Sequence, residues 1–227
     1  MKKLLFGMAM MIAAGMSCTQ KPQGGQAEAT DTVWALRANC MVNVTPENRD
    51  TVIALSKELV DSSRNDEGNI DYDLYESATN PNTFIIFETW NSQAMLDKHS
   101  ASPHFKRLVP AIQNLSDMTI QVFENGKEID STQALRLNCM VKVPAENRDT
   151  VISLYKELVK CSQTDEGMID YDLYLSTTDP TKIMVFESWK DQASLDKHST
   201  SPHYGRLVPQ IRKKAKSSLD KFNLPKE

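Results

Sequence analysis

All four histidines of this chain fall in two copies of one motif. His99 and His104 lie in the segment LDKHSASPHF, and His198 and His203 lie in LDKHSTSPHY. A partly buried imidazole can take or give a proton near neutral pH. His99 follows Leu96 by three residues, so both side chains face the sheet from one short helix. His99 and His198 are therefore candidate catalytic proton acceptors. The alternative is a structural histidine, hydrogen-bonded between helix and sheet.

His104 and His203 each follow a Ser-Pro pair, in the first turn of the next helix. They are candidate substrate-binding residues, or they simply help the chain to enter that helix. His99 and His104 are five residues apart, which is not the i, i+4 spacing of a helical metal pair. No Cys or acidic cluster in the sequence completes such a site, so no metal is expected.

Further polar and aromatic side chains are predicted to surround the histidine. Glu88 and Trp90 share one face of an apolar strand, and a carboxylate among aromatic rings has a raised pKa, which suits a proton acceptor. Tyr72 on the neighbouring strand can direct its hydroxyl into the same space, and Asn39 on the second face of the first strand can donate to a substrate oxygen. The equivalent residues of the second motif are Glu187, Trp189, Tyr171 and Asn138.

Each of these side chains also has a simpler explanation. The glutamate can pair with Arg or Tyr at the sheet rim, the tryptophan and tyrosine can belong to the core, and the asparagine can be an ordinary polar sheet residue. If the tryptophan is a pocket wall, it favours a flat aromatic ligand.

No cofactor is expected. The eight glycines include no G-x-G, so the chain has neither a dinucleotide fingerprint nor a phosphate loop. If the protein is a redox enzyme, the substrate must supply its own electrons.

The two motifs belong to a longer repeat. Residues 36–115 align without a gap to residues 135–214, and about 50 of the 80 paired positions are identical. A unit of this length is close to a small independent domain and too long for a solenoid repeat. We therefore predict a domain at 33–125, a linker at 126–134 and a second domain at 135–227. Two such domains can dock as an internal pseudo-dimer.

Alternating and helical patterns give each repeat a mixed architecture. The first repeat has predicted strands at 38–44, 70–74, 83–90 and 118–123, and predicted helices at 45–63, at 92–100 and from Ser102 onward. Thr45 is the expected cap of the first helix, with Pro46 at its first position. Pro110 must kink or split the last helix. The second copy of the final strand, 219–224, is much weaker.

This order describes a ferredoxin-like α+β unit. The strand at 83–90 is apolar on both faces, so it needs cover on both sides, and one repeat has too few helices to supply it. The other copy's sheet is the natural cover. The predicted fold is α+β, with two tandem ferredoxin-like domains whose sheets cover each other and a cavity beneath the helices.

The N-terminal residues predict export. Lys2 and Lys3 precede a short apolar run, so 1–17 is expected to be a signal peptide. The segment ending at Cys18 resembles a bacterial lipoprotein signal, in which Cys18 carries the lipid; an ordinary secretory signal is the alternative. Residues 18–32 then form a flexible tether. The expected location is the bacterial cell envelope, as a periplasmic or outer-membrane lipoprotein held to the membrane through its lipid alone.

Charge and cysteine content exclude some classes of protein. The formal charge of −4 becomes −6 once Lys2 and Lys3 are removed, and no basic stripe is present, so nucleic acid is not an expected partner. Cys40, Cys139 and Cys161 remain, an odd number without metal-type spacing. We interpret Cys40 and Cys139 as buried free thiols.

The strings EGNIDYDLY and FETWNSQAMLDKHSASPHF, with their second copies, resemble the antibiotic biosynthesis monooxygenase (ABM) family. These proteins are dimeric α/β barrels and include cofactor-free quinol monooxygenases and haem-degrading enzymes. The resemblance implies an intramolecular dimeric α/β barrel and a monooxygenase that acts on a quinol or polyphenol. A non-catalytic envelope protein that binds a small aromatic or hydrophobic molecule is the alternative. Haem binding or degradation is a weaker one, because Leu108, Val109 and Ile112 stand where those relatives place an iron ligand.

Overall fold

The computed structural model describes residues 34–225. The predicted signal peptide, Cys18 and the whole predicted tether lie outside these residues. Within the described part of the chain, no helix has the length and apolar character needed to cross a membrane.

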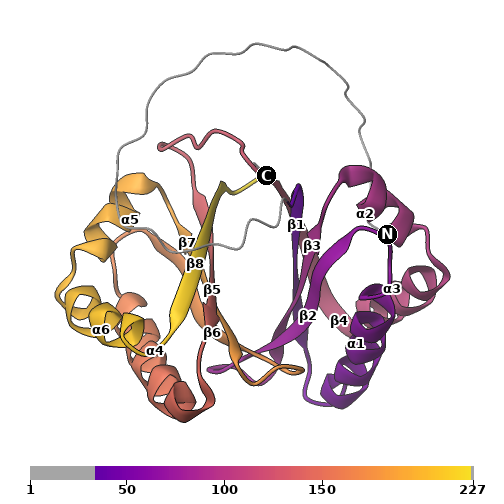
Figure 1. The fold of residues 1–227 in the computed structure, drawn as a ribbon, viewed down its shortest axis with the longest axis horizontal. Helices are drawn as coiled ribbons and strands as arrows, with labels where there is room; N and C mark the ends of the chain where they lie inside the picture. The colour runs from indigo at the N-terminus through magenta and orange to yellow at the C-terminus, as the bar shows by residue number, and fades with distance from the viewer. Residues whose placement is uncertain (1–33, 226–227) are drawn as a thin grey trace.

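Both halves follow the predicted element order (Figure 1). The first half consists of β1 (Leu36–Val44), α1 (Arg49–Ser63), β2 (Asn69–Ser77), β3 (Thr83–Trp90), α2 (Gln93–Ser100), α3 (Pro103–Leu115) and β4 (Ser116–Glu124). The second consists of β5 (Leu135–Lys142), the 3₁₀ turn η1 (Ala145–Asn147), α4 (Arg148–Ser162), β6 (Met168–Ser176), β7 (Lys182–Trp189), α5 (Gln192–Ser199), α6 (Pro202–Arg212) and β8 (Lys216–Asn223). The final strand of the second half is therefore complete, despite its weak pattern.

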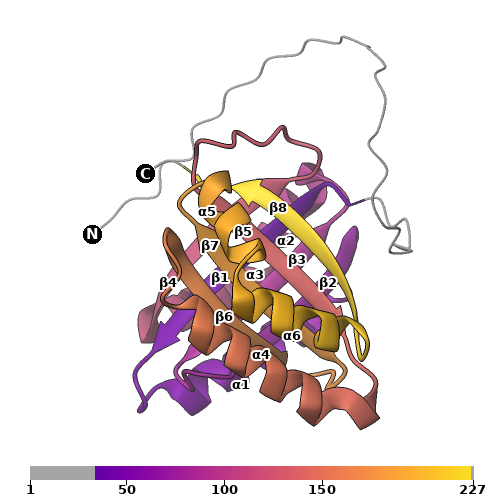
Figure 2. The ribbon, with the colours of Figure 1, turned by 90° about the vertical axis from the view of Figure 1, so that its left-hand side faces the viewer.

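The strands form one antiparallel sheet of eight, in the order β4-β1-β3-β2-β6-β7-β5-β8. β2 and β6 join the halves, with Tyr75 opposite Ser176. The sheet curls so that its two halves face each other, and the helices lie on the outer flanks (Figure 1). Figure 2 shows α4 and α6 lying across the outer face of the second half. The predicted α+β fold with two ferredoxin-like units is confirmed.

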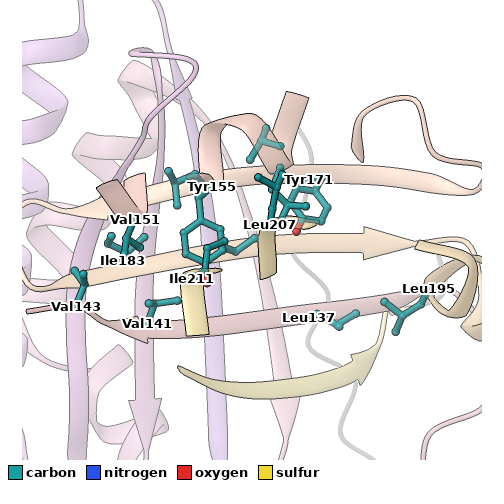
Figure 3. Close-up of a cluster of buried hydrophobic side chains, with 14 of the residues drawn as sticks. Leu137, Val141, Val143, Val151, Tyr155, Tyr171, Ile183, Leu195, Leu207 and Ile211 are labelled. Carbon is teal, nitrogen blue, oxygen red and sulfur yellow. The ribbon is translucent and has the colours of Figure 1, made fainter. Parts of the chain in front are cut away.

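Three apolar clusters hold this arrangement. One lies beneath the helices of each half, and Figure 3 shows the cluster of the second half. The third lies between the two halves of the sheet and contains Tyr75, Ile85, Phe87, Tyr174, Met184 and Phe186. Every residue of β3 is buried. The prediction that each sheet covers the other is therefore confirmed, and each large buried side chain contributes on the order of 2 kcal/mol.

Polar contacts between the halves come in reciprocal pairs. Asn39 Nδ2 donates to Asn138 Oδ1 at 3.1 Å, and Asn138 Nδ2 donates to Asn39 Oδ1 at 3.2 Å. Ser176 donates to Asp73 at 2.7 Å, and the equivalent Ser77 donates to Asp172 at 2.5 Å. Because both bonds of each pair are present, the halves are related by an internal pseudo-two-fold axis.

Two local predictions differ from the structure. α1 begins at Arg49 rather than at Pro46, because residues 46–48 form a turn and the Asn48 side chain donates to the carbonyl of Leu115 at 3.1 Å. This tertiary contact fixes the helix start in place of the Thr45 cap. Pro110 does not split α3, which runs on to Leu115. Pro110 is exposed, so water can bond the carbonyl that the missing N–H leaves free.

Candidate active site

In each half, aromatic rings enclose an imidazole beneath the helices. The His99 ring centroid lies 4.7 Å from that of Trp90, 5.0 Å from Phe105 and 5.5 Å from Tyr72. His99 is only 1% exposed. In the second half His198 lies among Trp189, Tyr204 and Tyr171 at 4.6, 5.2 and 5.4 Å, with Tyr204 at the position of Phe105. We call each such group of residues a chamber.

Local structure fixes the position of each imidazole. Ser92 caps α2 by accepting from the Met95 N–H, and Ser102 caps α3 by accepting from the Phe105 N–H. Gly68, at φ +80°, makes the turn into β2. A β-carbon at this position would overlap the Met95 side chain of α2, so the turn needs glycine for both conformation and space. The loop before β2 therefore packs against the helix that carries His99.

That loop contributes a carboxylate that the sequence did not reveal. Asp66 Oδ2 lies 2.7 Å from His99 Nδ1 and 3.0 Å from His104 Nε2. In the second half, Asp165 Oδ2 lies 2.8 Å from His198 Nδ1 and 3.0 Å from His203 Nε2. Asp66 is 33 residues from His99 along the chain. The recurring D-E-G triplet was the only signal available, and so much of the repeat is identical that it did not stand out.

The carboxylate determines the tautomer of His99. An ionised Asp66 can only accept, so His99 Nδ1 carries the proton and Nε2 keeps its lone pair. Nε2 is buried and has no hydrogen-bond partner among the described residues, and the same holds for His198 Nε2. Burial also lowers the pKa of His198, although Asp165 opposes this shift. The arrangement is a carboxylate–imidazole pair whose free nitrogen can accept a proton from a ligand.

A second buried acid lies beside the imidazole. Trp90 Nε1 donates to Glu88 Oε2 at 3.0 Å, and the Cys40 thiol donates to Glu88 Oε1 at 3.6 Å. Burial raises the pKa of Glu88, an effect that the nearby His99 and the Trp90 hydrogen bond oppose. In the second half, burial raises the pKa of Glu187 to about 7. Glu187 can therefore exist as a neutral acid near physiological pH.

Asn39 and Asn138 do not belong to the chambers, which corrects the prediction that they help to shape the pocket. Ala38 pairs with Glu88 across the sheet, whereas Asn39 pairs with Phe87 on the opposite face. Asn39 therefore points into the contact between the two halves, where its amide bonds Asn138. The structure brings together His99, Glu88, Trp90 and Tyr72, with His104 at the edge, and their equivalents in the second half.

The expectation that no acidic residue joins the histidines was wrong. Asp66, His99 and His104 present three atoms close enough to ligate a divalent ion, as do Asp165, His198 and His203. The separations of 2.7 and 3.0 Å are hydrogen-bond lengths, which fit a carboxylate shared by two imidazole N–H groups. The region predicted to lack an iron ligand is apolar core, since Leu108, Val109 and Ile112 are buried.

The first chamber is closed to solvent except at one edge. Trp90 and Tyr72 are at most 1% exposed, and Glu88 is 4% exposed. A recess of about 330 Å³ reaches His99 from outside, lined by Asp66, Glu67, Lys98, His99, Ala101, Ser102 and Pro103. A ligand would enter at the Asp66 edge and would have to displace part of the packed interior.

Comparison with known proteins matches both halves to one family. The chain fits the family described as antibiotic biosynthesis monooxygenase over residues 35–111 and again over residues 135–210. A Bacillus subtilis protein named "Putative monooxygenase YcnE" is 33% identical over 81 residues, which is 36% of this chain and 85% of that protein. The uncharacterized protein sll1783 of Synechocystis sp. is 38% identical over 68 residues, 30% of this chain. The match covers 46% of sll1783, so the chain spans just under half the length of this relative.

A solved structure also matches one half. A conserved protein of unknown function from Bacteroides thetaiotaomicron is 34% identical and has a TM-score of 0.40, covering 41% of this chain and 99% of that protein.

Proposed function

Because this chain belongs to the antibiotic biosynthesis monooxygenase family, we propose that it is a cofactor-independent monooxygenase that oxidises a quinol or polyphenolic aromatic with O2. The observation that carries the proposal is the buried, unpartnered Nε2 of His99. An atom of this kind costs about 1–3 kcal/mol when it stays unbonded, which a phenolic hydroxyl would recover. The surrounding aromatic rings suit a flat ligand.

The chemistry begins with proton transfer. His99 Nε2 takes a proton from a substrate hydroxyl, and Asp66 stabilises the imidazolium that forms. The electron-rich phenolate then reacts with O2 at a ring carbon and gives a peroxide anion, which takes the proton back from the imidazolium and becomes a hydroperoxide. Loss of water leaves an oxygenated quinone. For 1,4-naphthohydroquinone, C10H8O2 and O2 give 2-hydroxy-1,4-naphthoquinone, C10H6O3, and one H2O, so the substrate supplies all four electrons.

Oxygen uptake with 1,4-naphthohydroquinone tests the proposal. Uncatalysed oxidation gives 1,4-naphthoquinone and H2O2, whereas the proposed reaction gives the hydroxyquinone and water, with one atom of ¹⁸O2 in the product. We expect the His99→Ala/His198→Ala variant to lose about 100-fold or more of the rate. The matched control is Ser100→Ala/Ser199→Ala, which changes two exposed residues on the same helices. We expect this variant to keep the wild-type rate of oxygen uptake.

Uptake equal to the uncatalysed rate, or unchanged in the histidine variant, would remove the enzymatic proposal. Binding of the aromatic without uptake would favour the alternative, a barrel that holds a small hydrophobic molecule without chemistry.

Envelope location is part of the proposal and has its own test. Lipid attachment at Cys18 would hold the protein at a membrane. We expect the wild-type protein in the membrane fraction and the Cys18→Ser variant in the soluble fraction. A wild-type protein recovered in the soluble fraction would contradict lipid anchoring.

A further inference from the structure

The two halves differ at one buried position of their first helix. α1 places Ser56 there, and α4 places Tyr155 at the equivalent position. Both side chains are buried, Ser56 at 0% exposure and Tyr155 at 6%. A tyrosine carries a whole phenol ring that a serine lacks, so the repeat holds two versions of one chamber.

In the second half, Tyr155 occupies the interior. Figure 3 shows its ring among Leu207, Ile211 and Tyr171, and all four belong to one buried cluster. Its hydroxyl lies beside Cys139 and close to Glu187, and these contacts and burial raise its pKa. Tyr155 thus holds a phenol beside the buried acid, where an aromatic ligand would have to lie.

In the first half, the same region has polar atoms that lack partners. Ser56 Oγ, Tyr72 Oη and His99 Nε2 are buried without a hydrogen-bond partner among the described residues. Of the corresponding atoms in the second half, only His198 Nε2 is both buried and unpartnered. The Tyr72 hydroxyl lies near Glu88, and Ser56 corresponds to the residue that lies beside Glu187 in the other half. The Tyr72 and His99 ring centroids are 5.5 Å apart, so these two polar groups lie in one region, as two hydroxyls of a polyphenol would require.

On the edge strands, the larger side chain belongs to the first half, whereas at the helix position it belongs to the second half. β4 places Met118 opposite Val42, and β8 places Ser217 opposite Val141. Met118 packs against the apolar cluster of the first half. It is partly exposed and unbranched, so a ligand can displace it at low cost, whereas displacing Tyr155 would break a packed core.

We infer that only the first chamber binds ligand, that it takes an aromatic with at least two hydroxyl groups, and that Tyr155 closes the second chamber as a built-in substitute for that ligand. The inference rests on the proposed function for the class of ligand. It makes the second half a scaffold that completes the barrel, and it gives the protein one active site per chain.

Anaerobic equilibrium dialysis with 1,4-naphthohydroquinone counts the sites without turnover. We expect one equivalent bound per wild-type chain. Ser56→Tyr should weaken binding at least tenfold, and Ser56→Ala, which keeps the space but removes one hydroxyl, should weaken it about fivefold. Tyr155→Ser should bind two equivalents. Tyr155→Phe, which keeps the ring, is its matched control and should bind one.

The outcomes separate the two proposals. Two equivalents in the wild-type protein, or full binding by Ser56→Tyr, would overturn the inference even if oxygen uptake is present. One equivalent without oxygen uptake would remove the enzymatic function and leave the inference in place. If neither the wild-type protein nor the Tyr155→Ser variant binds 1,4-naphthohydroquinone, both the proposed function and the inference are wrong. If Tyr155→Ser does not fold, Tyr155→Leu takes its place, and the Ser56→Tyr result stands independently.

Discussion

Asp66 determines which nitrogen of His99 is free to act, so the site depends on a residue that would not touch the substrate. Asparagine at this position keeps the shape but loses the charge, and its amide can donate to Nδ1 and shift the proton to Nε2. We expect Asp66→Asn to lower kcat by about 100-fold while changing KM much less. Steady-state oxygen uptake measures both constants. Asp165→Asn is the matched control in the second half, and an equal loss there would contradict a single working site.

Glu187 predicts a dependence of stability on pH. Its pKa is raised from 4.5 to about 7 in the folded protein, so between these values the folded state binds more protons than the unfolded state. Stability is therefore lost as the pH rises from 4.5 through 7, by about 3 kcal/mol for this group. His198, whose pKa is lowered, has the opposite effect below its ordinary value.

Glu187→Gln should remove this loss, because glutamine can still accept the Trp189 hydrogen bond without a charge. Urea unfolding at pH 5 and pH 8 measures the difference. We expect the variant to gain stability over the wild-type protein at pH 8 and to differ little at pH 5. A constant difference across this range would show that Glu187 does not titrate there.

At the scale of strands, the edge strands β4 and β8 differ in the side chain that each offers to an arginine of the other half. Arg37 Nε donates to Asp220 of β8 at 2.7 Å. The equivalent of Asp220 in β4 is Gln121, whose Oε1 is buried without a hydrogen-bond partner among the described residues. In the same part of the chain, Arg136 Nε also lacks a hydrogen-bond partner, and Nη1 forms only an ion pair of 3.5 Å with Asp170. Burial lowers the pKa of Arg136 to about 10.

Gln121→Asp should supply the missing carboxylate. Because a charged hydrogen bond replaces unsatisfied buried atoms, we expect the free energy of unfolding to rise by about 1–3 kcal/mol at pH 7 in urea. Asp220→Asn should lower it by a similar amount. A destabilised Gln121→Asp protein would show that burying another carboxylate costs more than the pair returns.

These strands also show what the sequence could predict. Alternation placed Glu88, Trp90 and Tyr72 on one face, and the apolar character of both faces of β3 required a second sheet. The packing of one sheet on the other therefore followed from the pattern, whereas the barrel was implied by the family resemblance. Asp66 could not be found in this way, because no periodicity reports where a loop carboxylate points. The alternation also placed Asn39 on the face of its strand opposite to Ala38 and Cys40, and this face lies away from the chamber. The true start of α1 depends on Asn48 reaching Leu115, a contact made only in the folded chain.

At the scale of the whole molecule, each half supplies what the other needs. The cluster formed by Phe87, Phe186 and their neighbours is buried only because the halves dock, so either half alone would expose an apolar sheet face. Two copies of one half can cover that face in the same way, since the reciprocal Asn39–Asn138 bonds can form between identical chains as well. Fusion of the halves therefore removes the concentration dependence of a dimer and allows the chambers to diverge.

This reasoning predicts unequal fragments. A homodimer of residues 134–225 would contain two Arg136–Asp220 pairs, whereas a homodimer of residues 34–125 would place Arg37 opposite Gln121 twice. We expect light scattering to show that both fragments are dimers. In urea at equal concentration, the fragment 134–225 should have a free energy of unfolding higher by about 2 kcal/mol or more. Gln121→Asp in the first fragment should reduce the difference in free energy of unfolding between the two fragments. Soluble monomers, or a first fragment more stable than the second, would show that the buried arginines do not control how the halves pair.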